Sequence, residues 1–432
     1  MKKLLVYLLT IMIIACPLTA CSPANGDELP NETGNEPQMS AASLDIGDYI
    51  QLGKYADIPI VWRCVDIDEN GMLMLSDKTL CEKQFGLSNF WAESALRRWL
   101  NSDVPEGEEE WMPVDEDDQW GLSDFDRRDK KYNLEKGFLH PDNFAHSERA
   151  VMKTVIQWTM LPKDHLDLAE NGEMEAYSPV KGMTPNKGMN ERPVPICYDI
   201  SELPDVFTGA AHRLADTVFL LDEMQLYHFW NNFGGTREVL TTTYVPERYI
   251  NPPSAYWMDY YLRTPAPTLC IRISPSGAYG VFSRAELLGT RPAFYLNEAA
   301  AQILSGSGTE EEPYIVDGIS VYCDEEELSF DVPPIKEDDR VLVPMRKIFE
   351  VLGASVDWDG ETNTVTAIKD KTEISLEIGS NVMLKNGKKI ELDVPAKVMH
   401  DRTLVPIRAV SEGLGARVEW DEKKQAVWIW TD

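Results

Sequence analysis

The C-terminal region of this chain, Ile319 to Asp432, contains an internal copy of itself. Its most distinctive motif, Val343-Pro344-Met345-Arg346, recurs as Val405-Pro406-Ile407-Arg408, with 62 positions between equivalents. Four further motifs recur at the same offset: Leu352-Gly353 as Leu414-Gly415, Trp358-Asp359 as Trp420-Asp421, Asp331-Val332-Pro333 as Asp393-Val394-Pro395, and Asp339-Arg340 as Asp401-Arg402. Because chance does not hold one offset over five motifs, the region is expected to fold as two equivalent units.

Each unit has the pattern of a short helix followed by a hairpin. Pro344 suits the first turn of a helix, and apolar residues at helical spacing lead to Gly353, a C-terminal cap. Alternating segments at 354–358 and 364–368, joined through Asp359-Gly360, then predict two paired strands. The same order follows Pro406. The sequence therefore predicts a duplicated small antiparallel-sheet-plus-helix domain over residues 319–432.

This region resembles the copper amine oxidase N-terminal domain, which is common in surface proteins of Gram-positive bacteria. The resemblance rests on the paired Val-Pro-x-Arg, Glu-x-Leu-Gly and Trp-Asp motifs, with Glu350 and Glu412 in the second. It implies a stalk or adhesion module without redox chemistry. The region holds one histidine, His400, and one cysteine, Cys323, too few for a copper site. Arg346 and Arg408 are predicted to be structural ion-pair partners, with ligand contact as the alternative.

The N-terminus has the features of an export signal that ends in a lipid anchor. Lys2-Lys3 precede a short apolar run, and Leu18-Thr19-Ala20-Cys21 is similar to a lipobox. Residues 1–20 are thus predicted to be a lipoprotein signal peptide, and Cys21 the lipidated residue that holds the protein on the outer face of the cell membrane. An ordinary cleaved signal, or modification at Cys16, are the alternatives. Residues 21–40 have the composition of a flexible tether.

Composition limits the class of protein and its partners. A hydrophobic fraction of 43% predicts folded domains, and a net charge of −31 opposes binding to nucleic acid or to an anionic membrane surface. No cofactor is predicted. The scattered, odd-numbered cysteines of the folded part do not form a disulfide framework, although one bridge is compatible with them: Cys64, Cys81, Cys197, Cys270 and Cys323.

Residues 41–300 are predicted to form an α+β middle domain, and residues 301–318 a linker. The domain carries, in order, Pro59 to Arg63, Ser94 to Asn101, Asp216 to Leu221, Tyr260 to Pro265 and Arg291 to Ala293. This order resembles an uncharacterised domain family of Firmicute surface proteins. That family is distantly similar to the C-type-lectin-like fold, which also includes formylglycine-generating enzymes. The resemblance implies a lectin-like fold and brings no activity with it.

Two groups of residues in the middle domain are candidate sites. Tyr260, Tyr261, Arg263 and Arg272 combine aromatic faces with arginine forks, which suits a sugar or peptide ligand, and the first three lie beside prolines that predict a turn-rich surface segment. Asp66, Asp68 and Asn70 at alternate positions, with Gly71 at the sixth place and Asp77 at the twelfth, fit a calcium loop. Their flanks are predicted strands and Asn70-Gly71 is a hairpin pair, so a plain hairpin is the favoured interpretation. Most tryptophans, such as Trp91 and Trp99, are expected in the core.

These features favour a lipid-anchored, non-catalytic binding or adhesion protein for cell-wall polysaccharide or an extracellular protein. The alternatives are an enzyme related to formylglycine generation, for which Cys197 and Cys270 are the candidate thiols, and a structural spacer. The enzyme requires two cysteines within disulfide reach in a cleft. Binding requires an exposed aromatic row, and a spacer requires neither.

Overall fold

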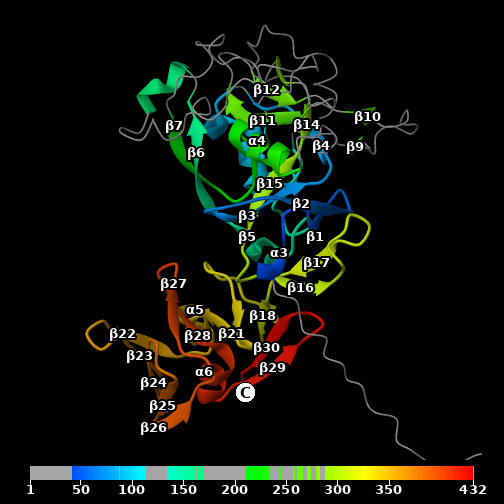
Figure 1. The fold of residues 1–432 in the computed structure, drawn as a ribbon. Coiled ribbons are helices and arrows are strands. Elements are labelled where there is room, and N and C mark those ends of the chain that lie inside the picture. Colours follow the sequence, from blue (N-terminus) through cyan, green and yellow to red (C-terminus); the bar gives the residue numbers. More distant parts are fainter. Residues whose placement is uncertain are drawn as a thin grey trace, which may run out of the picture. The chain divides into compact units, whose positions relative to one another are not determined.

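The computed structural model describes residues 41–86, 88–111, 134–161, 163–168, 211–233, 243–244, 256–257, 260–265, 270–273, 279–282 and 288–431. All of them belong to the compact unit that begins at Met39. Strands predominate over short helices (Figure 1). Separate hydrophobic cores form from residues before Gly318 and after it. The predicted signal peptide, Cys21 and the tether lie outside the described residues.

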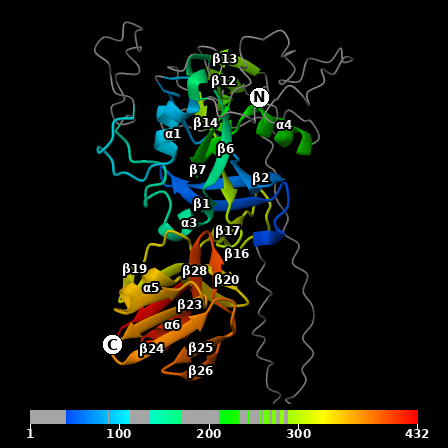
Figure 2. The ribbon, with the colours of Figure 1, turned by 90° about the vertical axis from the view of Figure 1, so that its left-hand side faces the viewer.

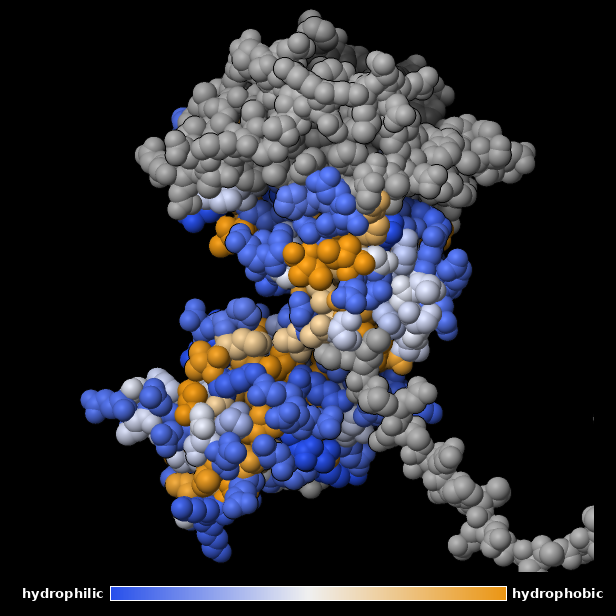
Figure 3. All heavy atoms as spheres, in the orientation of Figure 1, coloured by the Kyte–Doolittle hydropathy of each residue, from blue (hydrophilic) through white to orange (hydrophobic). Residues whose placement is uncertain are grey.

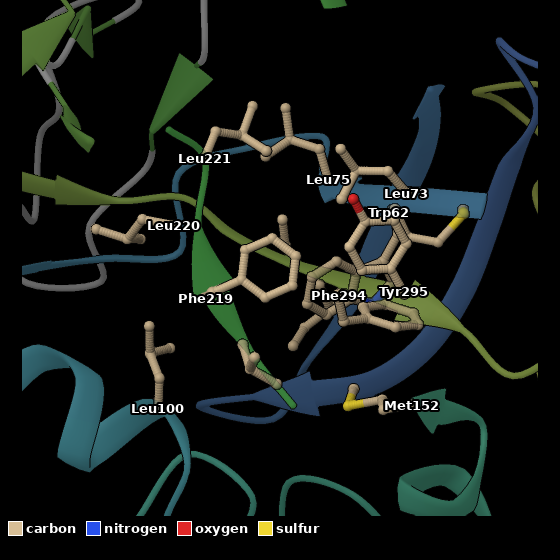
Figure 4. Close-up of a cluster of buried hydrophobic side chains, with 14 of the residues drawn as sticks. Trp62, Leu73, Leu75, Leu100, Met152, Phe219, Leu220, Leu221, Phe294 and Tyr295 are labelled. Atoms are coloured by element: carbon tan, nitrogen blue, oxygen red, sulfur yellow. The ribbon is translucent and has the colours of Figure 1, made fainter. Parts of the chain in front are cut away.

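The first core is built around a sheet in the order β16-β17-β1-β2-β3-β15-β5, in which β8 also pairs with β15. Its strands are β1 (Tyr49–Tyr55), β2 (Ile58–Asp68), β3 (Gly71–Ser76), β5 (Met152–Lys153), β8 (Phe219–Leu220), β15 (Pro292–Leu296), β16 (Gln302–Ser305) and β17 (Tyr314–Asp317). Trp62, Phe294 and Phe219 from these strands meet in the cluster of Figure 4, and the Trp62 and Phe294 rings pack edge to face at 4.8 Å. Burial of such rings is the main favourable term in folding this domain.

Residues 301–318 are not simply a linker, as composition predicted. Ile303 and Val316 are buried, and β17 pairs in parallel with β1 through Ile50 and Tyr314. The Gly- and Glu-rich segment between β16 and β17 is therefore a loop of the first sheet. The prediction of a linker rested on the composition of this segment, whereas the apolar residues on both sides of it are buried in the sheet.

A second sheet of the middle domain has the order β13-β12-β11-β14-β4. Its strands are β4 (Cys81–Lys83), β11 (Tyr260–Pro265), β12 (Cys270–Ile273), β13 (Tyr279–Phe282) and β14 (Leu288–Thr290). Two strand pairs accompany it: β6 (Val155–Met160) with β7 (Ala211–Asp216), and β9 (Thr243–Tyr244) with β10 (Tyr256–Trp257). The α-helices here are α1 (Ala95–Leu100), α3 (His146–Ala150) and α4 (Glu223–Asn232), and 3-10 turns span 41–43, 91–93 and 163–168.

The segment from Trp91 to Leu100 forms two short helices instead of one. A 3-10 turn ends at Glu93, and α1 begins after Ser94, whose hydroxyl accepts a hydrogen bond from the Arg97 backbone N–H at 3.1 Å. Ser94 is thus an N-cap between the two helices, which explains the break. Trp91 and Trp99 are buried, as predicted.

The repeat domain, residues 319–432, is organised about two equivalent strands. In the first copy (319–380), β21 (Arg340–Pro344) leads into α5 (Met345–Val351); in the second (381–432), β28 (Arg402–Pro406) leads into α6 (Ile407–Gly413). The strands pair antiparallel with Val343 opposite Val405, which are equivalent positions. The copies are therefore related by a pseudo-twofold axis at this pair. Gly353 and Gly415 follow the helices with φ of +74° and +94°, the left-handed conformation expected of such caps.

Each outer sheet of the repeat domain combines strands from both copies (Figures 1 and 2). One sheet has the order β22-β23-β24-β25-β26 and the other β19-β18-β30-β29. The first-copy strands are β18 (Ser320–Cys323), β19 (Glu326–Glu327), β22 (Ser355–Asp359), β23 (Thr364–Lys369) and β24 (Thr372–Glu377). The second-copy strands are β25 (Val382–Lys385), β26 (Lys388–Glu391), β29 (Arg417–Asp421) and β30 (Ala426–Trp430). The β18-β19 hairpin that starts the first copy thus pairs in parallel with β30, and the β25-β26 hairpin that starts the second copy pairs antiparallel with β24.

Reciprocal ion pairs explain two of the repeated motifs. Arg340 of the first copy contacts Asp393 of the second at 2.6 Å, and Arg402 contacts Asp331 at 2.5 Å. Both arginines end tight turns of two positive-φ residues, Asp338-Asp339 and His400-Asp401. These turns connect β20 (Ile335–Glu337) to β21 and β27 (Lys397–Met399) to β28. The repeated Asp and Asp-Arg motifs therefore join one copy to the other.

Candidate functional site

The predicted aromatic surface at Tyr260 and Tyr261 is wrong, because both rings are in the core. They are 2% and 0% exposed, and they lie in β11 between β12 and β14. Burial raises the pKa of Tyr260 above its ordinary value. Consecutive buried residues of this strand face both sides of a covered sheet, so the neighbouring prolines do not place it on the surface. Neither ring face is available to a ligand in this structure.

Arg263 is also buried, and its guanidinium serves the core. It donates to the Asp222 carboxylate, the Leu220 carbonyl and the Gln225 side-chain oxygen, each at 2.7 Å. Asp222 in turn caps α4 by accepting from the Gln225 N–H at 2.8 Å. Arg272 lies in β12 opposite Tyr261, and its side chain lies outside the described residues. The described contacts give Arg263 a structural role.

The polar network around Arg263 reaches one of the predicted calcium ligands. The Gln225 amide donates to the Tyr295 hydroxyl at 3.2 Å, and this hydroxyl donates to Asp68 at 2.5 Å. Burial, together with the Asp68 carboxylate, raises the pKa of Tyr295. Asp68 is therefore held by a phenol from the core.

The remaining predicted calcium ligands also have other partners or other positions. Asp66 contacts His228 Nδ1 at 3.1 Å and accepts from the Asn232 amide at 3.0 Å. Asp68 pairs with Gly71 across a tight turn, and Asn70 donates its backbone N–H to Asp68 at 2.7 Å. Asp77 follows the end of β3. The favoured hairpin is confirmed, and within the described ranges no group of three or more His, Cys, Asp and Glu side chains is placed to hold a metal ion.

Other motif residues of the middle domain connect distant segments. Asp216 accepts from the Trp91 indole at 2.8 Å and from Arg97 Nε at 2.6 Å. Asn101 accepts from the Thr217 and Val218 N–H groups and donates to the Val218 carbonyl. The motifs at 94–101 and 216–221 are therefore joined by hydrogen bonds. Their polar residues satisfy backbone and side-chain groups that would otherwise be buried without partners.

Three cysteines of the described part are buried. Cys64 and Cys323 are free thiols. Burial raises the pKa of the Cys64 thiol to about 12, so the thiol is neutral at physiological pH. The two candidate thiols of an enzyme cannot be compared, because Cys197 and the side chain of Cys270 lie outside the described residues.

An aromatic row does exist, on the repeat domain. Val427 and Ile429 of β30 are buried, so Trp428 and Trp430 face the other side of the sheet, where both are half-buried. Tyr322 of β18 pairs with Trp428 in parallel register, and their rings stack with centroids 4.3 Å apart and planes at 12°. Trp428 and Trp430 follow at 6.4 Å and 19°. We call Tyr322, Trp428 and Trp430 the aromatic row.

Two cations lie over the row. The guanidinium of Arg417 is 4.1 Å from the centroid of the Trp430 ring, and Lys424 Nζ is 5.7 Å from that of Trp428. Arg417 is 61% exposed and also contacts Glu419 at 3.4 Å. Cation–π contacts at such exposed positions contribute about 0.5–1 kcal/mol each, which limits ring motion without enclosing the row.

The pseudo-twofold repeat contains its own comparison for this surface. The positions equivalent to Tyr322, Trp428 and Trp430 are Leu384, Thr366 and Ile368, on the outer face of the other sheet. That sheet forms without an aromatic residue at any of the three. The fold therefore does not require the aromatic row. Aligning the two copies in the sequence shows this difference, and the prediction of candidate sites did not use it.

Arg346 and Arg408, predicted to be ion-pair partners, are instead exposed on the first turns of α5 and α6. Neither has an ion pair with another described residue. The sequence did not separate them from Arg340 and Arg402, which form the contacts between copies.

The duplicated hairpins, the helix after each Val-Pro-x-Arg motif and the glycine caps together define this region as a domain type. Residues 322–429 match the copper amine oxidase N-terminal domain family. The predicted resemblance of the C-terminal region is confirmed. This family is the non-catalytic N-terminal domain of copper amine oxidases.

The repeat domain does not have the side chains for a copper site. Cys323 is buried in β18, and burial raises the pKa of its thiol. His400 lies at the turn between β27 and β28. One thiol in a core strand and one imidazole in a turn of another sheet do not form the three- or four-ligand set that copper prefers.

Hydrophilic and hydrophobic residues interleave on the visible face of the repeat domain (Figure 3). Trp358, Ile368 and Val398 are exposed single apolar residues of this domain, with Trp358 at 44%. Trp358 lies in β22 of the other sheet. It is thus a useful reference for the aromatic row, because it is an exposed tryptophan that stacks on no other described ring.

Proposed function

We propose that this protein is lipid-anchored on the outer face of the cell membrane and binds a cell-wall or extracellular ligand without catalysis. The observation that carries the proposal is the aromatic row. Three aromatic side chains share the outer face of one sheet, while the equivalent positions of the other sheet have none. Half-exposed tryptophan and tyrosine beside arginine form the composition that dominates binding surfaces, and the fold does not require them here.

The anchoring part of the proposal is supported by sequence. Leu18-Thr19-Ala20-Cys21 supplies the cysteine, and the chain from Ser22 to Ser40 supplies the length of a tether. The described part of the chain contains no helix with the length and apolar character needed to cross a membrane. Two acyl chains at Cys21 would hold the protein at the membrane more stably than one.

Localisation tests the anchor directly. Cells that express the wild-type chain should retain it in the membrane fraction and incorporate labelled palmitate. Cys21→Ala should abolish the label and release the protein or leave an unprocessed precursor, whereas Cys16→Ala should change neither. Label retained in Cys21→Ala would refute lipidation at this residue.

Retention on isolated surface material tests the binding function. Full-length protein in detergent is incubated with purified peptidoglycan, wall polysaccharide and extracellular matrix proteins at several salt concentrations. Saturable retention on one of them that survives moderate salt supports binding, because contacts dominated by aromatic rings are less screened than surface charge pairs. Absence of retention on all three would favour a structural spacer.

We also propose that the middle domain is a distant C-type-lectin-like fold. Its support is the order of motifs from Pro59 to Ala293 and their roles as mutual contacts in the core. An experimental structure of the chain would test the proposal by superposition. A strand order in the middle domain that cannot be aligned with lectin-like domains would refute it.

A further inference from the structure

We infer that the aromatic row binds an uncharged glycan chain, with sugar rings packed along Tyr322, Trp428 and Trp430. This inference rests on the proposed binding function and adds the chemical class of the ligand. It depends on what lies on either side of the row, on the order of its rings and on the charge of the protein.

Polar side chains flank the row on both neighbouring strands. In β29, Glu419 pairs with Trp428 and Arg417 pairs with Trp430. In β19, Glu327 pairs with Tyr322. The outer face therefore has an apolar centre on β18 and β30, with carboxylates on both sides and a guanidinium on one.

This arrangement matches the chemistry of a sugar ring. A pyranose has C–H faces that pack on aromatic groups and a rim of hydroxyls that both donate and accept hydrogen bonds. Carboxylates accept from hydroxyls, and arginine donates to them. A chain of such rings would place its C–H groups on the aromatic row and its hydroxyls toward Glu327, Glu419 and Arg417.

The row is partly ordered before any ligand arrives. Stacking of Tyr322 on Trp428 and the contact of Arg417 with Trp430 restrict these side chains. Restricted rings lose less conformational entropy on binding, which favours affinity. Arg417 and Lys424 cover the ring faces in part, and a sugar would share or displace these solvent-exposed side chains.

Charge selects an uncharged ligand over an acidic one. The protein has a net charge of −31, and two of the flanking groups are carboxylates. A polyanion would meet this field with repulsion, whereas hydroxyl groups would not. Glu327 accepts from the Ser320 hydroxyl at 3.1 Å and Glu419 contacts Arg417 at 3.4 Å, and each carboxylate can accept further hydrogen bonds from sugar hydroxyls.

Calorimetric titration of the full-length protein with defined oligosaccharides tests the inference. The neutral probes are hexamers of N-acetylglucosamine and of glucose, and the acidic probe is a galacturonate hexamer. The variants carry the residues found at the equivalent positions of the other sheet: Trp428→Thr, Trp430→Ile and Tyr322→Leu. The other sheet folds with these residues, so the variants are expected to fold, which a thermal melt verifies. Trp358→Ala is the matched control.

One neutral hexamer is expected to bind wild type and the control equally. Trp428→Thr and Trp430→Ile should each weaken this binding about tenfold or more, as central aromatic contacts do. Equal affinity of folded Trp428→Thr and wild type, tighter binding of the acidic hexamer, or no binding of either neutral hexamer would each overturn the inference.

The two proposals fail in different ways. If wall material retains wild type and the Trp428→Thr variant equally, surface binding stands and the glycan assignment to the row falls. If a neutral hexamer binds through the row but no surface material retains the protein, the row stands and the surface function falls. Retention by matrix protein alone, without hexamer binding, assigns a protein partner and refutes the glycan.

Discussion

Replacing Arg263 with alanine is expected to lower the free energy of unfolding of the middle domain. The reason is that its guanidinium holds core residues together and does not contact a ligand. The side chain of Arg263 is 3% exposed and that of its partner Asp222 is 7% exposed. Arg263→Ala would leave the Asp222 carboxylate buried beside Leu220 with one charge partner fewer. Loss of one member of a buried, hydrogen-bonded ion pair typically costs about 3–5 kcal/mol. Set against a total stability of about 5–15 kcal/mol, this is a large fraction.

Urea unfolding followed by tryptophan fluorescence measures the effect of Arg263→Ala. Arg340→Ala is the matched control, because it removes an arginine from an ion pair whose side chains are 44% and 69% exposed. An exposed pair contributes about 0–1 kcal/mol, so the control should stay close to wild type. In the double variant Arg263→Met with Asp222→Asn, the buried charge is gone, and the loss should be smaller than for Arg263→Ala. An unfolding free energy of Arg263→Ala within about 1 kcal/mol of wild type would refute the structural role.

Three further predictions follow from the described contacts. Arg340→Asp should weaken the repeat domain slightly, by up to about 1 kcal/mol, and adding Asp393→Arg should restore it; restoration that does not diminish at high salt would contradict an ion pair. Cys64, with a pKa of about 12, should resist alkylation by iodoacetamide near neutral pH until the chain is unfolded in urea, and rapid labelling of native protein by mass spectrometry would contradict its burial. Burial raises the pKa of Asp317 above 3.8, so the charged carboxylate lowers the free energy of unfolding above the folded-state pKa, and this cost is relieved as pH falls. In urea unfolding, Asp317→Asn should therefore raise the free energy of unfolding relative to wild type more near neutral pH than near pH 4. An equal difference at both pH values would refute the shift.

The middle domain shows where residue type is a poor guide to exposure. Tyr260, Tyr261 and Arg263 have the side chains of a binding surface, yet they form a covered strand and a buried ion pair. Consecutive large residues with no alternation are a signal for a strand buried on both faces, and that signal was stronger than the nearby prolines. The calcium pattern at Asp66 failed for the reason that its flanking strands indicated, since a tight hairpin does not gather alternate side chains around one point.

The sequence by itself determined the local structure of the repeat domain. Proline before the helix, glycine after it and alternation beyond it act over a few residues, so both copies adopt the predicted helix and hairpin. Only the tertiary structure decided that β18 of the first copy pairs with β30 of the second, which places Tyr322 beside Trp428. Pairing between strands so far apart depends on which apolar faces cover the common core, and no local pattern records that choice. The candidate binding surface lies at this junction, where two segments that each lack a complete row form one together.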